Sequence, residues 1–598
     1  MTAPSTTSTA PARSDMALAR ILWRDLAEQR AILAVAVLLY VPLTIASVVQ
    51  PLLIAGAVDE GFRAGSQSAV VQWAGLFFGV VVIRATVEGI QGLLMQILGQ
   101  RAVRTLRVRL FAKLQRLPLA FFDRQPLGRL MTRVTNDSES VAELFQAGAV
   151  SLVGDVLFLV GTIVMLFLVD VRLSVASLVV LPPMFVALQW FRRRAREAFT
   201  RVRTAVAALN ATLQEQLAGM AVVQLFARMQ TASAKLEHEN EAYTQANKEA
   251  IFLDAGIYAL VDGVGTIAVA ITLVAAAHIG IDGVAGMSAA QGALSLGVLV
   301  AFVDALGRFF MPLRELSNKT TLIQSALVAA DRIVTLESEP ETITAPASPA
   351  PARFERDVAF HDVHFAYEGG PPVLQGLTLA VKKGERVAIV GHTGAGKSTI
   401  IKLVPRLYDV TKGRITIDGT DVRDFDPRAL RRLTTAVPQE TFLFQGTIRE
   451  NLAFGAANAS DEALMAAAKA CCADEVVVRH GGLLAKVSER GQNLSLGERQ
   501  LLALTRALIA DPPIVILDEA TASVDRETER KLQVAQEELL AGRTAIIVAH
   551  RLSTIERCDR IILLHHGVVA EEGTHAELMA KGGRYAALVE LQRAGAGA

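Results

Sequence analysis

The fold of the chain's second half is decided by the stretch Gly391-His392-Thr393-Gly394-Ala395-Gly396-Lys397-Ser398. It fits the pattern Gly-x-x-x-x-Gly-Lys-Ser/Thr and follows a strand-like run, Arg386–Val390. The glycines let backbone N–H groups turn toward phosphate oxygens, and the N-terminus of the following helix attracts an anion. We expect Lys397 to hold the β- and γ-phosphates of a nucleotide and the hydroxyl of Ser398 to bind Mg²⁺. The predicted phosphate-binding set is Gly391, Thr393, Gly394, Gly396, Lys397, Ser398 and Thr399.

A second motif further along the chain places two acids at the end of an apolar strand. It reads Pro513-Ile514-Val515-Ile516-Leu517-Asp518-Glu519. A buried strand that delivers carboxylates at its C-terminal end suits metal binding beside phosphates. We expect Asp518 to position Mg²⁺, directly or through water, and Glu519 to polarise the attacking water as a general base. The two motifs together predict an α/β nucleotide-binding domain that hydrolyses its nucleotide.

The first half of the chain has the composition of a membrane protein. Of the 598 residues, 52% are hydrophobic and only 20% are charged. About 20 apolar residues are enough to cross the hydrocarbon core of a bilayer as a helix. We therefore predict six transmembrane helices, which excludes a soluble nucleotide-binding protein of translation or DNA repair. The stretches without Asp, Glu, Lys or Arg are 31–58, 64–83, 173–191, 263–281 and 283–303, and a sixth, 144–169, carries only Asp155.

The basic residues of the loops predict the orientation in the membrane. Segments 99–143 and 192–250 each hold nine Lys or Arg residues, whereas the loops on the opposite side hold only Arg63 and Arg172. Because basic loops stay on the inner side, we expect these two segments, both termini and the nucleotide-binding domain to be cytoplasmic at the cell (inner) membrane. Residues 15–30 form an amphipathic stretch that we expect to lie on the inner surface of the bilayer.

A few ionisable residues fall inside or near the predicted spans. Charges there are costly and need partners or water. Two interpretations stay open: they line a polar cavity that contacts a substrate, or they are interfacial residues and ion pairs that lock helices together. The residues concerned are Arg84, Glu88, Asp155, Asp254, Asp262 and Asp304.

A linker rich in Pro, Ala, Ser and Glu separates the two halves. We expect residues 1–14 to be disordered, 15–336 to form the transmembrane domain with its cytoplasmic loops, 337–354 to form the linker and 355–598 to form the nucleotide-binding domain.

Charge and cysteine content exclude other classes. The chain has 60 basic and 59 acidic residues, which gives no signal for nucleic-acid binding. The three cysteines, Cys471, Cys472 and Cys558, lack metal-ligand spacing and do not suggest a disulfide scaffold.

Taken together, the motifs resemble those of ATP-binding-cassette transporters. Leu494-Ser495-Leu496-Gly497-Glu498-Arg499-Gln500, between the two phosphate motifs, is similar to the family's signature Leu-Ser-Gly-Gly-Gln. Ser495 and Gly497 are kept, while Leu496 and Glu498 depart from the pattern. The resemblance implies that Ser495, with Gly497 and the helix start beside it, touches the γ-phosphate of ATP bound to an opposite subunit. The departures leave the strength of that contact open.

The resemblance assigns further roles in the order in which the family has them. Tyr367 is implied to stack on adenine, and Gln439 to sense Mg²⁺ and the membrane domain. Asp525 is implied to cross the dimer interface, and His550 to contact the γ-phosphate. Glu489-Arg490-Gly491 resembles the segment with which exporters contact the partner's cytoplasmic loops.

Two cytoplasmic segments resemble the coupling loops of exporter half-transporters of the lipid-flippase and multidrug branch. The first runs from Leu117 to Arg124 and continues through Gly128-Arg129-Leu130, and the second is 219–226. Phe121 and Phe122 are implied to fit a cleft in a nucleotide-binding domain.

The resemblance implies an exporter half-transporter that works as a dimer and uses ATP and Mg²⁺. We expect export or flipping of an amphiphilic substrate, a lipid or a drug-like molecule, by alternating access. Glu519 and His550 predict that this chain's own phosphate side is competent for hydrolysis, while the altered signature would weaken the partner's site. This balance slightly favours a heterodimer over a homodimer. The alternative function is an ATP-gated membrane regulator or channel that moves nothing uphill.

Overall fold

The computed structural model describes residues 29–144, 146, 149–281, 294–518, 525–549 and 551–596. These residues form two compact units. The first comprises the described residues up to Lys113 together with Gly128–Ser338, and the second comprises Leu114–Leu127 together with the described residues from Glu339 onward. The expected disorder of 1–14 and most of the amphipathic stretch 15–30 lie outside the described residues.

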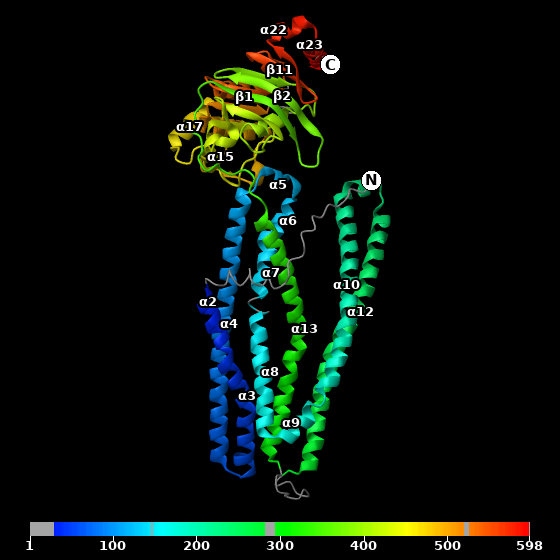
Figure 1. The fold of residues 1–598 in the computed structure, drawn as a ribbon. Helices are drawn as coiled ribbons and strands as arrows, with labels where there is room; N and C mark the ends of the chain where they lie inside the picture. The colour runs from blue at the N-terminus through cyan, green and yellow to red at the C-terminus, as the bar shows by residue number, and fades with distance from the viewer. Residues whose placement is uncertain are drawn as a thin grey trace. The chain divides into compact units, whose positions relative to one another are not determined.

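The first unit is made of helices, several of them very long (Figure 1). Its α-helices are α2 (Arg30–Leu38), α3 (Tyr40–Gly56), α4 (Gln67–Arg116, which runs on into the second unit), α6 (Leu127–Thr132), α7 (Ser138–Glu143), α8 (Ala149–Val169), α9 (Val171–Leu178), α10 (Leu181–Ala218), α11 (Met220–Leu225), α12 (Met229–Ile279) and α13 (Leu296–Ser338). Two π-helical segments, Ala57–Arg63 and Arg133–Asp137, continue α3 and precede α7.

The prediction of six transmembrane helices is confirmed. In the described part of the chain, six helical segments are long and apolar enough to cross a membrane: Arg30–Arg63, Gln67–Arg116, Val150–Val169, Val171–Ala218, Met229–Ile279 and Leu296–Leu313. Helix α4 has 50 residues, which at 1.5 Å per residue is about 75 Å, whereas the hydrocarbon core is about 30 Å thick. These long helices therefore continue well beyond a bilayer.

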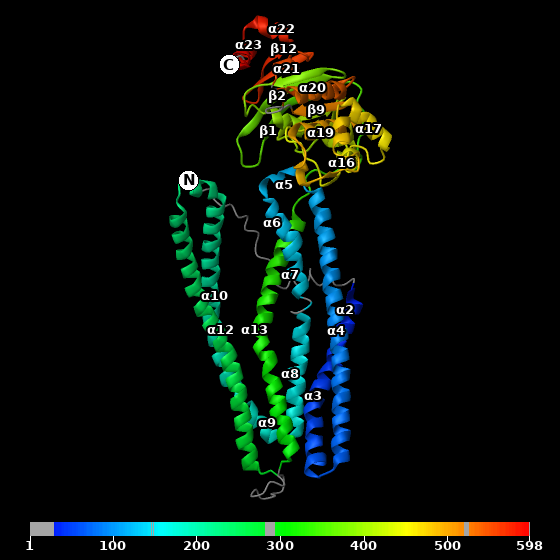
Figure 2. The same ribbon diagram turned by 180° about the vertical axis from the view of Figure 1, so that it is seen from behind.

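Helices α10 and α12 lie side by side along their length, as both ribbon views show (Figures 1 and 2). Two ion pairs join the charged halves of these two helices. Arg201 of α10 pairs with Glu249 of α12 at 2.5 Å, and Glu215 of α10 pairs with Lys235 of α12 at 2.8 Å. Helix α11 joins the two at one end. The pair is thus a stiff antiparallel arm that ends in a short apolar helix.

Most ionisable residues of the spans have partners within their own unit. Asp155 of α8 pairs with Lys319 of α13. On α13, Asp304 pairs with Arg308 at 3.0 Å, and Arg308 also donates to Gln50 of α3 at 2.5 Å. These contacts support the interpretation of pairs that lock helices together. Arg84 and Glu88 pair along one helix at 3.6 Å, while no ion pair involving Asp254 or Asp262 is found among the described residues.

The second unit is built on two sheets. The larger has the order β12-β11-β3-β10-β9-β6, in which all neighbours run parallel except β12. Its strands are β3 (Arg386–Val390), β6 (Thr434–Val437), β9 (Ile514–Asp518), β10 (Thr544–Val548), β11 (Arg560–His565) and β12 (Val568–Gly573). The smaller, antiparallel sheet has the order β2-β1-β4-β5, with β1 (Asp357–Ala366), β2 (Pro372–Lys382), β4 (Lys412–Ile417) and β5 (Thr420–Asp421). A short pair, β7 (Gly446–Thr447) and β8 (Lys486–Val487), stands apart.

Alternation along the strands divides the core into two layers. In β9, Ile514 and Ile516 pack with the smaller sheet and α14, whereas Val515 and Leu517 pack with the helical layer on the other face. The α-helices of the second unit are α5 (Leu119–Arg124), α14 (Lys397–Leu403), α15 (Pro427–Leu433), α16 (Ile448–Ala453), α17 (Asp461–Ala470), α18 (Asp474–Arg479), α19 (Leu496–Ile509), α20 (Arg526–Leu540), α21 (Leu552–Ile555), α22 (His575–Lys581) and α23 (Arg584–Ala596). The predicted fold class, a six-helix membrane domain fused to an α/β domain with a phosphate loop, is confirmed.

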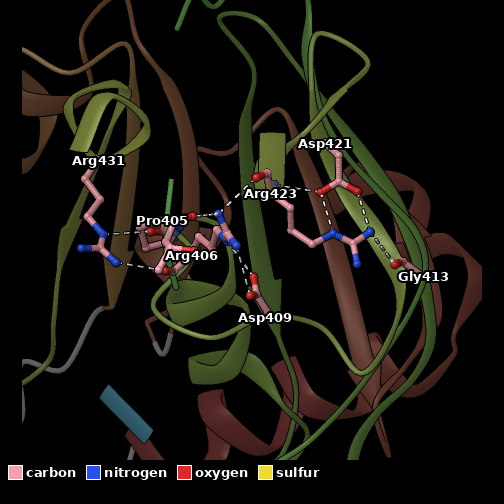
Figure 3. A network of polar contacts seen from close by, with 8 residues as sticks. Pro405, Arg406, Asp409, Gly413, Asp421, Arg423 and Arg431 are labelled. Atoms are coloured by element: carbon pink, nitrogen blue, oxygen red, sulfur yellow. Dashed lines mark hydrogen bonds and ion pairs between the residues drawn. The ribbon is translucent and has the colours of Figure 1, made fainter. Parts of the chain in front are cut away.

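Arg406, Arg423 and Arg431 belong to a network of polar contacts in the second unit (Figure 3). One hydrogen bond of Arg406 reaches the predicted linker, at Thr344. The buried Arg406 binds the Asp409 carboxylate through Nε at 2.8 Å, and its Nη1 donates to the carbonyls of Thr344 at 3.4 Å and Arg423 at 3.2 Å. Arg431 in turn donates to the Arg406 carbonyl at 3.1 Å. Part of the linker is therefore fixed by hydrogen bonds rather than free.

Candidate functional site

The phosphate loop connects β3 to α14. Gly391 has φ of +152° and Gly396 has φ of +99°, and an added Cβ at these positions would lie 2.4 Å from the Leu564 carbonyl oxygen and 2.7 Å from Leu374 Cδ2. Only glycine fits both the backbone conformation and the space. The loop can therefore point successive backbone N–H groups at one anion, as its sequence predicts.

Lys397 is folded back onto this loop. Its Nζ donates to the carbonyls of Gly391 at 2.6 Å and His392 at 3.0 Å. Burial lowers the pKa of the Lys397 amine, and the carboxylate of Asp518 partly offsets that effect. A buried ammonium that is bound by two backbone carbonyls is well placed to be stabilised further by phosphate oxygens.

Asp518 and Ser398 meet across the sheet. Strands β3 and β9 flank β10, so their C-terminal ends open on the same edge. The Ser398 hydroxyl donates to Asp518 Oδ2 at 3.4 Å. Gln439 follows β6, the neighbour of β9, and its side chain is exposed. The structure thus brings the predicted phosphate-loop and Mg²⁺ residues to one edge of the sheet.

The catalytic residues predicted from the sequence are Glu519, His550 and Gln439, and the first two of these lie outside the described residues. Each directly follows a described segment: Asp518 ends β9, and Ala549 follows β10. Their predicted roles remain proposals. Asp525 is described and caps α20, accepting the N–H groups of Glu527 and Thr528 at 3.0 and 2.9 Å. These backbone hydrogen bonds lower its pKa.

Tyr367 follows β1 beside the phosphate loop. Its hydroxyl lies 3.3 Å from Thr399 Oγ1, and its ring meets Phe365 and Tyr408 edge-on, with centroids 4.9 and 5.4 Å apart. The Nζ of Lys402 lies 5.5 Å from the Tyr367 ring centroid. The sequence did not single out Tyr408 or Lys402, because neither belongs to a motif used there.

The signature segment begins α19 with a capping box. Ser495 Oγ accepts the N–H of Glu498 at 3.3 Å, and Glu498 Oε2 accepts the N–H of Ser495 at 2.8 Å. Glu498 also contacts Arg479 at 3.1 Å and His480 at 3.4 Å. Burial opposes ionisation of Glu498, but the hydrogen bonds from Ser495 and the contact with His480 hold its pKa below the usual range. The departure at 498 is therefore compatible with a well-formed helix start.

A groove of about 710 Å³ opens beside the signature segment. It is bounded by Gln439, Phe442, Arg490, Leu496 and other residues of the same region. Phe442 and Phe444 are large apolar side chains left exposed near it. Gln439 and Arg490, the central residue of the predicted segment Glu489-Arg490-Gly491, thus line a common groove.

The two predicted coupling segments differ in their surroundings. Leu119 and Ala120 of α5 pack against the core of the second unit, and Phe121 is 2% exposed. Phe122 borders a cavity of about 470 Å³ within the same unit. The second segment, at α11 in the first unit, presents an apolar tip made of Leu217, Met220, Val222, Leu225, Phe226 and Met229, all exposed in the single chain.

Comparison with known proteins covers most of the chain. Residues 33–313 match the family model described as the ABC transporter transmembrane region, and residues 374–522 match the model described as ABC transporter. The ATP-dependent lipid A-core flippase of Syntrophus aciditrophicus is 33% identical over 90% of this chain and 88% of its own length. A probable multidrug resistance ABC transporter protein of Bacillus subtilis, YheH, is 35% identical over 87% and 76%. The structure of a bacterial Atm1-family ABC exporter with ATP bound superposes with a TM-score of 0.75, at 28% identity over 95% of this chain and 98% of that one.

Proposed function

Because the chain belongs to the ABC transporter family, as an exporter half-transporter with fused transmembrane and ATPase regions, we propose that it exports or flips an amphiphilic lipid or drug-like molecule across the inner membrane. It is an ATP-driven exporter, and the proposal concerns its substrate, its site residues and its assembly. The single observation that carries the proposed ATP site is the meeting of Lys397, Ser398 and Asp518 at one edge of the sheet.

At this edge the chain's residues divide the work on ATP. Backbone N–H groups of the loop and Lys397 hold the phosphates, and Tyr367 stacks on the adenine. Glu519, directly after β9, orients and deprotonates the attacking water, and His550 holds the γ-phosphate in line. Gln439 reports the state of the site to the membrane segments.

Mg²⁺ fits this donor set. The Ser398 hydroxyl and an Asp518 carboxylate oxygen lie 3.4 Å apart, and both are hard oxygen donors of the kind that Mg²⁺ takes as ligands. Within the described residues, no cluster of three or more His, Cys, Asp or Glu side chains could hold a metal alone, which suits an ion shared with phosphates and waters. When bound, the ion neutralises charge that develops on the phosphates. Ser398 and Asp518 would hold it, with Gln439 nearby.

We propose a dimer because two surfaces of the single chain expose large apolar side chains to solvent. The apolar tip at α11 gathers large exposed hydrophobic side chains, and the groove beside the signature segment is bordered by the exposed Phe442. A tip from one copy seated in the groove of another would remove both from water. Ser495 and the start of α19 would then face the ATP of the opposite chain. Whether the second chain is identical or a related partner is decided by the experiment below.

The substrate is proposed to be amphiphilic because the spans offer apolar walls whose charges are mostly paired internally. Asp155 is bound to Lys319, and Asp304 to Arg308. The relatives named above act on a lipid and, by their description, on drugs. The basic loops favour a cytoplasmic position for the ATPase, and we propose that the substrate is taken from the inner leaflet or the cytosol.

The test is ATP turnover and transport by the full chain alone, purified and reconstituted into liposomes. The Glu519→Gln variant serves as the blank, and we expect this substitution to lower turnover by about 10²-fold or more while ATP binding is kept. Uphill movement of a fluorescently labelled phospholipid between leaflets, dependent on ATP, would support the proposal. Turnover without movement against a gradient would favour the gated regulator. ATP binding without turnover would mean that a different partner chain is required.

A further inference from the structure

Within the second unit, Tyr408 connects the coupling helix α5 to Tyr367, the residue proposed to stack on adenine and called here the adenine platform. Its hydroxyl donates to Asp123 Oδ2 of α5. Its ring meets that of Tyr367 edge-on, with centroids 5.4 Å apart and planes at 85°. Phe365 lies against both rings, at 4.9 Å from Tyr367 and 5.8 Å from Tyr408. The three rings therefore form one edge-on cluster that contains Tyr367 and reaches α5 through the Tyr408 hydroxyl.

The same platform is attached to the phosphate loop. The Tyr367 hydroxyl is 3.3 Å from Thr399 Oγ1, which lies in the first turn of α14. The Lys402 ammonium lies 5.5 Å from the Tyr367 ring centroid and 5.7 Å from that of Tyr408, within the range of a cation–π contact. Tyr367 is thus held from one side by the helix that binds phosphates and from the other by the ring that reaches α5.

Two further features allow the rings and α5 to move together. Arg124 of α5 pairs at 2.8 Å with Glu368, the neighbour of Tyr367. A cavity of about 400 Å³ lies among Ala120, Asp123, Tyr367 and Tyr408, so the rings have room to shift when a base arrives. Burial, together with the hydrogen bond to Asp123, raises the pKa of Tyr408, so its hydroxyl remains a donor throughout the physiological range.

We infer that Tyr408 is a positioning residue through which α5 responds to the base, and not only to the phosphates, of a nucleotide bound at Tyr367. This rests on the proposed role of Tyr367 as the adenine platform. A base stacked on Tyr367 fixes that ring, the edge-on contact fixes Tyr408, and the hydroxyl of Tyr408 fixes Asp123. A polyphosphate without a base fills the phosphate loop but leaves α5 as it was.

Hydrogen exchange tests this without knowledge of the transported substrate or partner. The full chain carrying Glu519→Gln, in lipid nanodiscs, is compared with Mg²⁺-ATP and with Mg²⁺-tripolyphosphate, at concentrations that protect residues 391–399 equally. We expect ATP to slow exchange in residues 119–125 about tenfold more than tripolyphosphate, the scale of one hydrogen bond.

The variants separate the hydrogen bond from general packing. Tyr408→Phe and Asp123→Ala should lose the difference between ATP and tripolyphosphate, and the double variant should be no worse than either alone. Asp123→Asn, which still offers an acceptor oxygen, should keep it. Tyr585→Phe, which removes a hydroxyl bound instead to His575 at 2.7 Å, is the matched control and should behave like the parent.

Equal protection of α5 by ATP and tripolyphosphate in the parent would overturn the inference. So would a full difference in Tyr408→Phe, or a loss in Asp123→Asn as large as in Asp123→Ala. The proposed function fails separately: if the chain with Glu519 intact hydrolyses ATP no faster than Glu519→Gln, while ATP still protects α5 through Tyr408, the relay stands and the hydrolytic role does not.

Discussion

Replacing Glu498 tests whether the departure from the signature is compensated at the start of α19. In the capping box, the Glu498 carboxylate accepts the Ser495 N–H at 2.8 Å, while Ser495 Oγ accepts the Glu498 N–H at 3.3 Å. Glu498→Ala removes the hydrogen bond from the Ser495 N–H to the carboxylate, the negative charge and the contact with Arg479. Glu498→Gln keeps an acceptor for the Ser495 N–H and removes only the charge.

The expected magnitudes follow from these contacts. A cap hydrogen bond is worth about 1 kcal/mol, and a negative charge in the first turn of a helix about 0.3–1 kcal/mol. The pair with Arg479, whose side chain is 64% exposed, adds well under about 1 kcal/mol. With about 2–4 °C per kcal/mol for a large domain, Glu498→Ala should lower Tm by about 5 °C and Glu498→Gln by less than about 2 °C.

Thermal unfolding of the full chain in nanodiscs, at one heating rate, measures these shifts. The pKa of Glu498 is depressed in the folded chain, so its charge-dependent stabilisation is present above the unfolded-state pKa, about 4.3, and is lost as the pH falls through the folded value. The gap between the parent and Glu498→Gln should therefore close as the pH is lowered through 4. If Glu498→Gln is as destabilised as Glu498→Ala, the charge and not the capping bond carries the effect. If Glu498→Ala keeps the parental Tm, the capping box contributes nothing and the reasoning fails.

Two further predictions concern the phosphate loop and the spans. Gly396→Ala should weaken ATP binding at least about tenfold in titration calorimetry, because the Gly396 φ is +99° and the new Cβ would lie 2.7 Å from Leu374 Cδ2. Gly394→Ala, at a φ of +85° with open space around it, should lose less ATP affinity, and equal losses of affinity would contradict the steric argument. Lys319→Met should destabilise the membrane unit by about 3–5 kcal/mol because it leaves the Asp155 carboxylate without its cation, whereas Lys319→Met with Asp155→Leu should recover most of the stability. Thermal unfolding in nanodiscs measures both variants, and a double variant less stable than the single one would refute the locking role.

Features that depend on residues close together in the sequence could be predicted from it. The phosphate loop needs glycine at 391 and 396 because of local backbone conformation and close approach, so its motif carries its own structural signal. The six spans depend on long apolar runs, which composition alone reveals. The capping box at the signature could also be predicted, because Ser495 and Glu498 have the Ser-x-x-Glu spacing. Comparison with the family signature alone hides it, because there Glu498 is only a departure from the pattern.

Contacts between distant residues could not be predicted in this way. Asp123 and Tyr408 are 285 positions apart, and Arg124 and Glu368 are 244 apart. Neither pair has a local pattern, because each depends on how α5 is placed against the smaller sheet. The hydrogen bond from Arg406 to the Thr344 carbonyl likewise gives a Pro- and Ala-rich segment a fixed position that its composition argues against.

The path of the chain explains how a displacement of the short helix α5 can be transmitted to the first unit. The chain passes between the two units at 113/114, 127/128 and 338/339. Two of these crossings lie at or within long helices: α4 runs unbroken through the first, and α13 ends at the third. A continuous helix transmits displacement over its length because its hydrogen-bonded backbone resists bending, whereas a flexible linker would absorb it. Only Leu117 and Pro118 separate α5 from α4, so a shift of α5 caused by a base on Tyr367 would pass to α4 through this short connection. Loss of the Tyr408 hydroxyl should therefore impair coupling more than it impairs ATP binding.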